Sequence, residues 1–257
     1  MKLYNLSKKK ITLAAFSIIF FTIMLAIVIK SISDRNRINE NIDNYKENIK
    51  IVVNSEEELP YLKVDIQKLK AKNKDVIGWL RIPSIALDMP LVQGNDNEFY
   101  LNHDIDKNKN SAGWAFIDSR NNLDYLNMNT VLYGHNLINR QFGLLKRLLD
   151  NNINNKKDFD LIQFTTEDKE MIFKICSIYI VKENNWSYTE ISFEKDDRKA
   201  SFIKNIKDKN IKKVFNKNNL SFGDKLLTFS TCYGSSGTNK RLVVHAKLEG
   251  IKKISKK

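Results

Sequence analysis

The run from Ile11 to Ile29 is uncharged and almost wholly apolar, and it constrains the fold of this chain more than any other feature. A helix over this run rises about 1.5 Å per residue and is about 28 Å long, close to the hydrocarbon thickness of a bilayer. Lysines precede the run at Lys8 to Lys10 and follow it at Lys30. The pattern predicts a transmembrane helix over residues 11–29.

A cleaved signal peptide is the alternative interpretation of this run. The run is longer than a typical signal core, and no small-x-small cleavage site follows it in Lys30 to Asp34, so we favour an uncleaved anchor. Basic residues stand on both sides of the run, and this charge pattern does not set the orientation. They are Lys2, Lys8, Lys9 and Lys10 before it, and Lys30, Arg35, Arg37 and Lys46 after it.

The net charge of +13, from 43 Lys plus Arg against 30 Asp plus Glu, raises the question of a nucleic-acid partner. The lysines are scattered among asparagines and acids, and no nucleic-acid motif accompanies them, so we predict no such partner. The two cysteines, Cys176 and Cys232, form neither a disulfide framework nor a zinc-binding spacing. We therefore expect no metal site and a fold stabilised by packing.

Residues 30–72 carry apolar side chains at helical spacing, first at Ile38, Ile42, Tyr45 and Ile49 and again over Leu62 to Ala71. The second piece places Leu62, Ile66 and Leu69 on one face. We interpret 30–72 as a helical stalk that packs on the following domain. A flexible spacer remains the alternative.

From Val76 the pattern changes to short apolar runs separated by turn residues, which is typical of an all-β barrel or sandwich. Two helices are expected between the runs, over Phe142 to Leu149 and over Asp196 to Lys207. Eight strands make a closed barrel plausible. The expected strands are Gly78 to Ile82, Met89 to Gln93, Gly113 to Asp118, Thr130 to Tyr133, Phe159 to Thr165, Lys169 to Val181, Lys225 to Thr231 and Arg241 to Glu249.

Cys232 stands where an apolar strand ends, and Arg241 opens the next strand. A cysteine attacks carbonyls as the thiolate, which a nearby positive charge favours, so these two residues could act on one substrate. The loop from Tyr233 to Thr238 is rich in small residues and allows close approach of a substrate. Cys176 lies in the middle of an apolar strand and is expected to be a buried structural cysteine.

Three histidines compete for the acid/base role. His135 follows a strand through Gly134 and belongs to a strand-end loop, where catalytic groups concentrate. His245 lies about 13 Å further along its strand than Arg241, at roughly 3.3 Å per residue. His103 is expected to be structural, and we favour His135.

Several blocks of the sequence resemble one family. The Thr231-Cys232 strand end, the run from Arg241 to Val244 and the Tyr133-Gly134-His135 block are similar to those of sortases, the membrane-anchored cysteine transpeptidases of Gram-positive bacteria. The stretches Val76 to Pro83, Pro90 to Gly94 and Asn97 to Asp104 resemble class B sortases in particular. The resemblance runs from about Asn73 to Glu249.

The resemblance implies a role for each site residue. Cys232 is the nucleophile, His135 protonates the leaving amine and Arg241 stabilises the oxyanion. Class B sequences often carry an acidic residue after the cysteine, and here Tyr233 stands instead. The residues expected to contact the substrate are Asn97, Leu101, Tyr133, Ser230 and Thr231.

The resemblance also implies a mainly β fold: a closed eight-stranded sortase-like barrel with N-terminal helices and a long helix between the sixth and seventh strands. The catalytic domain spans 73–257, and 1–10 is a cytoplasmic N-terminus, which places the domain outside the cell membrane and facing the wall. The expected partners are a surface protein with a sorting signal (NPxTN- or PxTG-like) and an amine of a peptidoglycan precursor or pilin, with no cofactor. A cysteine peptidase and an inactive wall-binding module are the alternatives.

Overall fold

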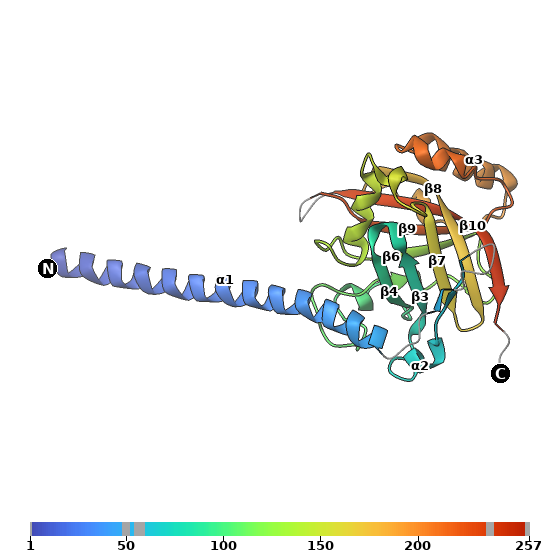
Figure 1. Cartoon of the computed structure of the whole chain (residues 1–257). Coiled ribbons are helices and arrows are strands. Elements are labelled where there is room, and N and C mark those ends of the chain that lie inside the picture. Colours follow the sequence, from blue (N-terminus) through green and yellow to red (C-terminus); the bar gives the residue numbers. More distant parts are fainter. Residues whose placement is uncertain (1, 48–51, 54–59, 235–238, 255–257) are drawn as a thin grey trace.

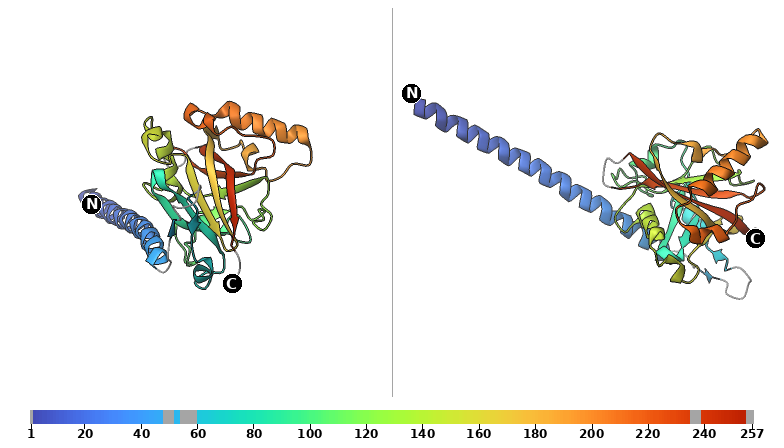
Figure 2. Two further views of the ribbon diagram at one scale, coloured as in Figure 1. Left: turned by 45° about the vertical axis from the view of Figure 1, so that its right-hand side comes forward. Right: turned by 90° about the horizontal axis from the view of Figure 1, so that it is seen from above.

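The computed structural model describes residues 2–47, 52–53, 60–234 and 239–254. A long helix, α1 (Lys2–Glu47), extends away from a β-barrel, and its last turns lie against the barrel (Figure 1). The end of the strand β10 (Lys240–Lys253) lies on the side of the barrel away from the one toward which α1 extends, and Figure 2 shows α1 and the barrel from two further sides.

The barrel is closed by strands in the order β10-β8-β7-β3-β4-β5-β6-β9. Most neighbours are antiparallel, whereas β4 with β5 and β6 with β9 are parallel. The prediction of a closed eight-stranded barrel is confirmed. The strands are β3 (Val76–Ile82), β4 (Leu87–Val92), β5 (Phe116–Ile117), β6 (Asn129–Tyr133), β7 (Leu161–Thr166), β8 (Lys169–Lys182), β9 (Leu226–Cys232) and β10 (Lys240–Lys253).

The interior of the barrel is filled by large side chains that alternate along the strands, because successive residues of a strand point to opposite faces. Leu80 on β3, its partner Phe164 on β7, and Phe229 on β9 are fully buried there. On β9 all residues but the last are buried. On its outer face Leu226 packs in one cluster with residues of the helix α3 (Asp196–Lys209), and the Ser230 Oγ lies 3.0 Å from the hydroxyl of Tyr188. Strand β9 therefore sits in a rigid part of the wall.

The two expected inserted helices differ in type. The long helix between the sixth and seventh barrel strands is α3, with Phe202, Ile203 and Ile206 buried on its inner face. The segment expected as a short helix over Phe142 to Leu149 is the 3-10 helix η3 (Gln141–Leu149). The further short 3-10 helices are η1 (Pro83–Ile85), η2 (Phe99–Leu101), η4 (Ile153–Asn155), η5 (Ser187–Thr189) and η6 (Lys213–Lys217).

The stalk is helical only in part. Leu62 lies in strand β2 (Leu62–Lys63), which pairs with β1 (Val52–Val53), and the helix α2 covers only Ile66–Lys70. The expectation of one helical face over 62–71 is therefore wrong, because the hydroxyl of Thr165 on β7 donates to the carbonyl of Leu62 and holds that stretch extended. The three expected apolar residues of this face are nevertheless buried. Ile49, with the rest of 48–51 and 54–59, lies outside the described residues.

Helix α1 has two parts with different surroundings. From residue 10 to 30 every side chain is exposed, and α1 is the one helix among the described residues that is long and apolar enough to cross a membrane. Further along, Ile38, Asn41 and Tyr45 are at most 4 % exposed because they pack on the barrel domain. The Arg37 Nε lies 3.1 Å from an Oδ2 of the fully buried Asp104. The apolar segment thus continues without a break into a docked helix.

Docking of α1 predicts a difference between two isoleucines of the same helix. In the full chain in detergent micelles, Ile38→Ala should lower the free energy of unfolding by about 2–5 kcal/mol, because it leaves a cavity at a fully buried site. Ile32→Ala, at a side chain that is 53 % exposed, should change it by less than about 0.5 kcal/mol. Denaturant titration followed by tryptophan fluorescence measures both. Equal losses in the two variants would contradict the docking.

Candidate active site

A cavity of about 450 Å³ opens where β6 and β9 end and β10 begins. It brings together all eight residues expected from the sequence, although they come from four separate segments of the chain. Among the described residues, Phe116, Gly134 and Trp186 also line it. The eight are Asn97, Leu101, Tyr133, His135, Ser230, Thr231, Cys232 and Arg241.

The register of the strands places the reactive groups beside each other. Tyr133 on β6 is the partner of Ser230 on the parallel strand β9. Both strands run in the same direction past this pair. His135 and Cys232, each two residues further on, therefore lie at the same end of the barrel. Neighbouring strands lie about 4.8 Å apart, which puts a thiol and an imidazole on adjacent strand ends.

Cys232 and Arg241 are direct partners across β9 and β10. The Arg241 Nη1 donates to the Cys232 Sγ at 3.1 Å. The other arm of the guanidinium forms an ion pair with Glu183, and the Arg241 Cζ lies 5.8 Å from the centre of the Trp186 ring. A guanidinium is always charged, so a fixed positive charge faces the sulfur.

His135 is held by a backbone carbonyl. Its Nε2 lies 2.8 Å from the oxygen of Leu101, and because a carbonyl only accepts, Nε2 carries a proton. Gly113 lies beneath the ring with a φ of 57°, and a Cβ there would lie 2.9 Å from the Cδ2 of His135. Glycine at 113 thus permits both the left-handed backbone and the close approach of the imidazole.

Most of the residues expected to contact the substrate are held by hydrogen bonds to neighbouring residues. The Ser230 Oγ lies 3.0 Å from the hydroxyl of Tyr188, while the Oγ1 of Thr231 is buried without a hydrogen-bond partner in the part of the chain that the structure describes. The Tyr133 hydroxyl donates to Asp118 at 2.9 Å. The Asn97 Oδ1 accepts from the backbone of Ser119 at 2.8 Å.

The turn at Asp118 holds Tyr133 through a charged network. Arg120 donates to both carboxylate oxygens of Asp118, at 2.9 and 2.7 Å. Burial alone would raise the pKa of Asp118, but the hydrogen bonds from Arg120, Asn97 and Tyr133 outweigh it and lower this pKa. The carboxylate therefore stays charged and anchors the hydroxyl of Tyr133.

Sequence reasoning missed Trp186, Glu183 and Tyr188. All three follow β8 in a polar stretch, where Trp186 is the one large aromatic residue beside asparagines. Trp186 is 46 % exposed. Nothing in the local sequence indicates that Glu183 pairs with Arg241, because that contact depends on the β8–β10 register.

The other cysteine and the other histidines have structural surroundings. Cys176 is buried, and burial raises the pKa of its thiol to about 12. The ring of His103 stacks on Phe99 with centroids 4.0 Å apart. His245 is fully buried, with Nε2 2.7 Å from the Tyr179 hydroxyl and Nδ1 2.7 Å from the Thr228 hydroxyl. Among the described residues no cluster of His, Cys, Asp and Glu could hold a metal ion.

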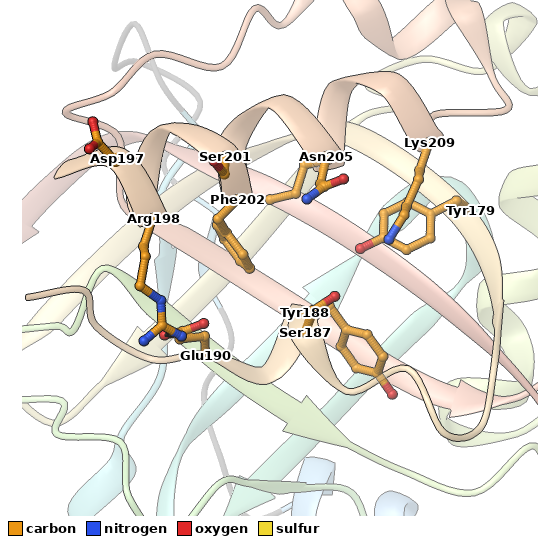
Figure 3. Close-up of a pocket in the computed structure, with 11 residues that line it drawn as sticks. Tyr179, Ser187, Tyr188, Glu190, Asp197, Arg198, Ser201, Phe202, Asn205 and Lys209 are labelled. Carbon is orange, nitrogen blue, oxygen red and sulfur yellow. Dashed lines mark ion pairs between the residues drawn. The ribbon is translucent and has the colours of Figure 1, made fainter. Parts of the chain in front are cut away.

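A second hollow, of about 270 Å³, lies outside the barrel wall between α3 and the segment that carries η5 (Figure 3). Arg198 reaches across one end of it to Glu190, with Nη2 and Oε1 2.7 Å apart. Tyr188 lines this hollow while its hydroxyl contacts Ser230 of the catalytic cavity. Its side chain therefore forms part of the wall between the two spaces.

Comparison with known proteins places this arrangement in a family. The sortase domain model matches residues 80–249. The chain belongs to the sortase family. The sortase is 30 % identical to sortase B of Staphylococcus aureus, over 81 % of this chain and 83 % of that protein. The identification of the sequence as a class B sortase, a cysteine transpeptidase, is confirmed.

Solved structures agree with this assignment. A Staphylococcus aureus sortase B–substrate complex is 32 % identical, with a TM-score of 0.65 over 74 % of this sortase and 85 % of that chain. A sortase B complexed with triglycine is 33 % identical, with a TM-score of 0.63 over 74 % of this sortase and 86 % of that chain. The barrel described above is therefore the sortase B fold.

The buried His245 predicts a pH dependence of stability. Burial, with a contribution from the charge of Lys209, lowers the pKa of His245 from 6.5 to about 3. Between these values the unfolded chain binds a proton that the folded chain does not, so stability is complete above pH 6.5 and falls by up to about 1.4 kcal/mol per pH unit below it. The slope of the free energy of unfolding between pH 4 and 6 should decrease by this amount in His245→Gln. Identical slopes in the two proteins would refute the prediction.

Proposed function

We propose that this sortase cleaves the sorting signal of a surface protein after a threonine and transfers the new carboxyl group to an amine. The observation that carries the proposal is the 3.1 Å contact between Arg241 Nη1 and Cys232 Sγ, inside the cavity that His135 also lines. This is the set of groups that a covalent acyl transfer needs: a nucleophile, a proton donor and a fixed donor to the oxyanion.

In the first half-reaction the Cys232 thiolate attacks the threonine carbonyl carbon, and the negative charge moves to the oxygen. Arg241 donates to this oxyanion, because its guanidinium is fixed in place by Glu183 and Trp186. His135, as the imidazolium, gives its proton to the departing amine as the C–N bond breaks. The product is a thioester on Cys232 and a neutral imidazole.

In the second half-reaction a primary amine attacks the thioester carbonyl. Neutral His135 accepts a proton from the amine, the C–S bond breaks and the thiolate leaves with its electron pair. An amide has replaced the thioester, and the thiolate and imidazolium are restored.

The proposed substrates are a signal resembling NPxTN or PxTG and an amine from a peptidoglycan precursor or a pilin. The cavity supports the first, because Leu101, Phe116 and Trp186 offer apolar surface beside the polar Asn97 and Ser230. The relatives support both, since a Staphylococcus aureus sortase B is solved with a substrate and another sortase B with triglycine.

We further propose an organisation along the chain. Residues 11–29 form an uncleaved anchor in the cell membrane, 1–10 lie in the cytoplasm, 30–72 connect the anchor, and 73–257 form the catalytic domain outside the cell, facing the wall. Helix α1 supports the anchor, because its exposed apolar part is continuous with residues packed on the barrel domain.

A peptide assay tests the reaction. The full chain in detergent micelles should cleave quenched peptides that carry Asn-Pro-Gln-Thr-Asn or Ser-Pro-Gln-Thr-Gly after the threonine, and added triglycine should divert the product into an amide adduct. Mass spectrometry follows the products. Cys232→Ala should abolish cleavage, whereas Cys176→Ala, at the buried thiol, should retain it.

The outcome of this assay separates the proposal from its alternatives. Release of free acid only, whatever the amine, would identify a peptidase. No cleavage of either signal would leave a wall-binding module.

Arg241 should be irreplaceable by another cation. Arg241→Lys keeps the charge but loses the planar fork that contacts both Cys232 and Glu183, so kcat/KM should fall about 100-fold, corresponding to about 3 kcal/mol. Arg198→Lys is the matched control, because Arg198 pairs with a glutamate in the second hollow. A loss of less than about threefold in Arg241→Lys would exclude the proposed oxyanion contact.

A further inference from the structure

The docked part of α1 contacts the two loops that carry catalytic-cavity residues. Asp34 accepts hydrogen bonds from Ser111 N and Oγ at 3.0 and 2.7 Å, and the Asn110 Nδ2 donates to its carbonyl at 3.1 Å. The Arg140 Nη2 donates to the Asn36 Oδ1 at 3.4 Å. One loop, residues 101–113, begins at Leu101, and the other, residues 134–140, contains His135. Helix α1 thus fixes both loops relative to its own axis.

The position of these contacts along α1 sets their height above a membrane. The uncharged run ends at Ile29, and the headgroup layer outside the hydrocarbon core is about 5–8 Å thick on each side. Asp34 lies five residues beyond Ile29, which is about 7.5 Å along the helix. If α1 spans a bilayer, the loops meet the helix at the outer boundary of the headgroups.

The surface at this level has the side chains that an interface requires. Ile138, in the second loop, is 75 % exposed, more than any other large apolar residue outside α1 among those described, and Leu101 in the first loop is 41 % exposed. Lys30 and Arg35 are exposed on α1 at the same level. Apolar tips beside cationic side chains suit the headgroup region of an anionic bilayer.

Figure 1 agrees with this geometry. In Figure 1 the green loops that precede β6 and the yellow-green segment that follows it lie on the side of the barrel domain toward which α1 extends, while the end of β10 lies on the far side. No flexible linker separates the apolar part of α1 from the docked part, since α1 is one helix from Lys2 to Glu47. The angle between the barrel and the bilayer is then set by packing.

We propose that the loops 101–113 and 134–140 rest on the headgroup surface of the membrane that α1 crosses, with Ile138 inserted, so that the Cys232 cavity works at the bilayer surface. This inference rests on the proposed anchor and transpeptidation. It implies that the enzyme favours a signal held in the same membrane over the same signal in solution, because docking on the bilayer removes most of the search for the cavity.

Depth measurements test the contact without catalysis. In a Cys232→Ala background, whose remaining Cys176 is buried, bimane is attached at Ile138→Cys, Ile251→Cys or Phe20→Cys of the full chain. The proteins are placed in phosphatidylglycerol/phosphatidylcholine vesicles with nitroxide on the headgroups or on the acyl chains. Headgroup nitroxide should quench position 138 at least threefold more than position 251, which is 44 % exposed in the wild-type chain and lies near the end of β10, on the side of the barrel away from the N-terminal part of α1 (Figure 1). Acyl-chain nitroxide should quench position 20.

Each outcome decides one statement. Quenching at 20 with equal quenching at 138 and 251 would overturn the loop contact and leave the anchor intact. Absence of quenching at 20 would overturn the anchor, and the contact with it. Neither result bears on the transpeptidase reaction, which the peptide assay reads separately.

A helical insertion tests the consequence for activity. An insertion of seven alanine-rich residues between Ile32 and Ser33 lengthens α1 by about 10 Å, in nearly two turns. The apolar part of α1 then keeps its rotational position relative to the barrel domain, and the docking contacts from Asp34 onward are kept. Quenching at 138 should disappear. The rate on a signal anchored in the same vesicle by its own apolar helix should fall at least tenfold, while the rate on the soluble peptide stays the same. An unchanged rate on the anchored signal, or quenching that persists, would refute the proposal.

Discussion

Closure of the barrel by the parallel pairing of β6 and β9 is the constraint on which the rest of the structure depends. Without it the sheet would have two open edges, and His135 and Cys232 would end distant strands. With Tyr133 opposite Ser230, both reactive side chains lie at the same end of the barrel, on neighbouring strands. The closed barrel buries the inner face of β9, and residues of α3 and Tyr188 pack on its outer face, so a nucleophile at the end of this strand has little freedom to move.

The antiparallel pairing of β10 with its two neighbours, β9 and β8, places a positive charge at the nucleophile. Pairing of β10 with β9 places Arg241 against Cys232, and pairing of β10 with β8 brings Glu183, just past the end of β8, to the other arm of the same guanidinium. An arginine that contacts a sulfur with one arm and a carboxylate with the other keeps its direction. The site is therefore preorganised by the sheet, and its binding loops are added around it.

Helix α1 extends this rigidity toward the membrane. Its contacts at Asp34, Arg37 and Tyr45 attach it to the loop that follows Leu101, a cavity residue. In a protein with a flexible linker, the membrane helix would not fix the orientation of the domain that it anchors. Here the buried carboxylate of Asp104 faces Arg37, and breaking such a pair by removing one partner is costly because an uncompensated charge remains.

The sequence by itself determined the class of fold, the candidate membrane helix, the eight barrel strands and the three candidate reactive residues. Local periodicity and the position of a residue at a strand end depend only on residues adjacent in the sequence, so they can be recognised without the tertiary structure. Only the tertiary structure decided the contacts of Glu183, Trp186 and Tyr188, and the extended conformation of Leu62. These depend on register between strands and on a hydroxyl from Thr165, far away in the chain, so no local pattern encodes them.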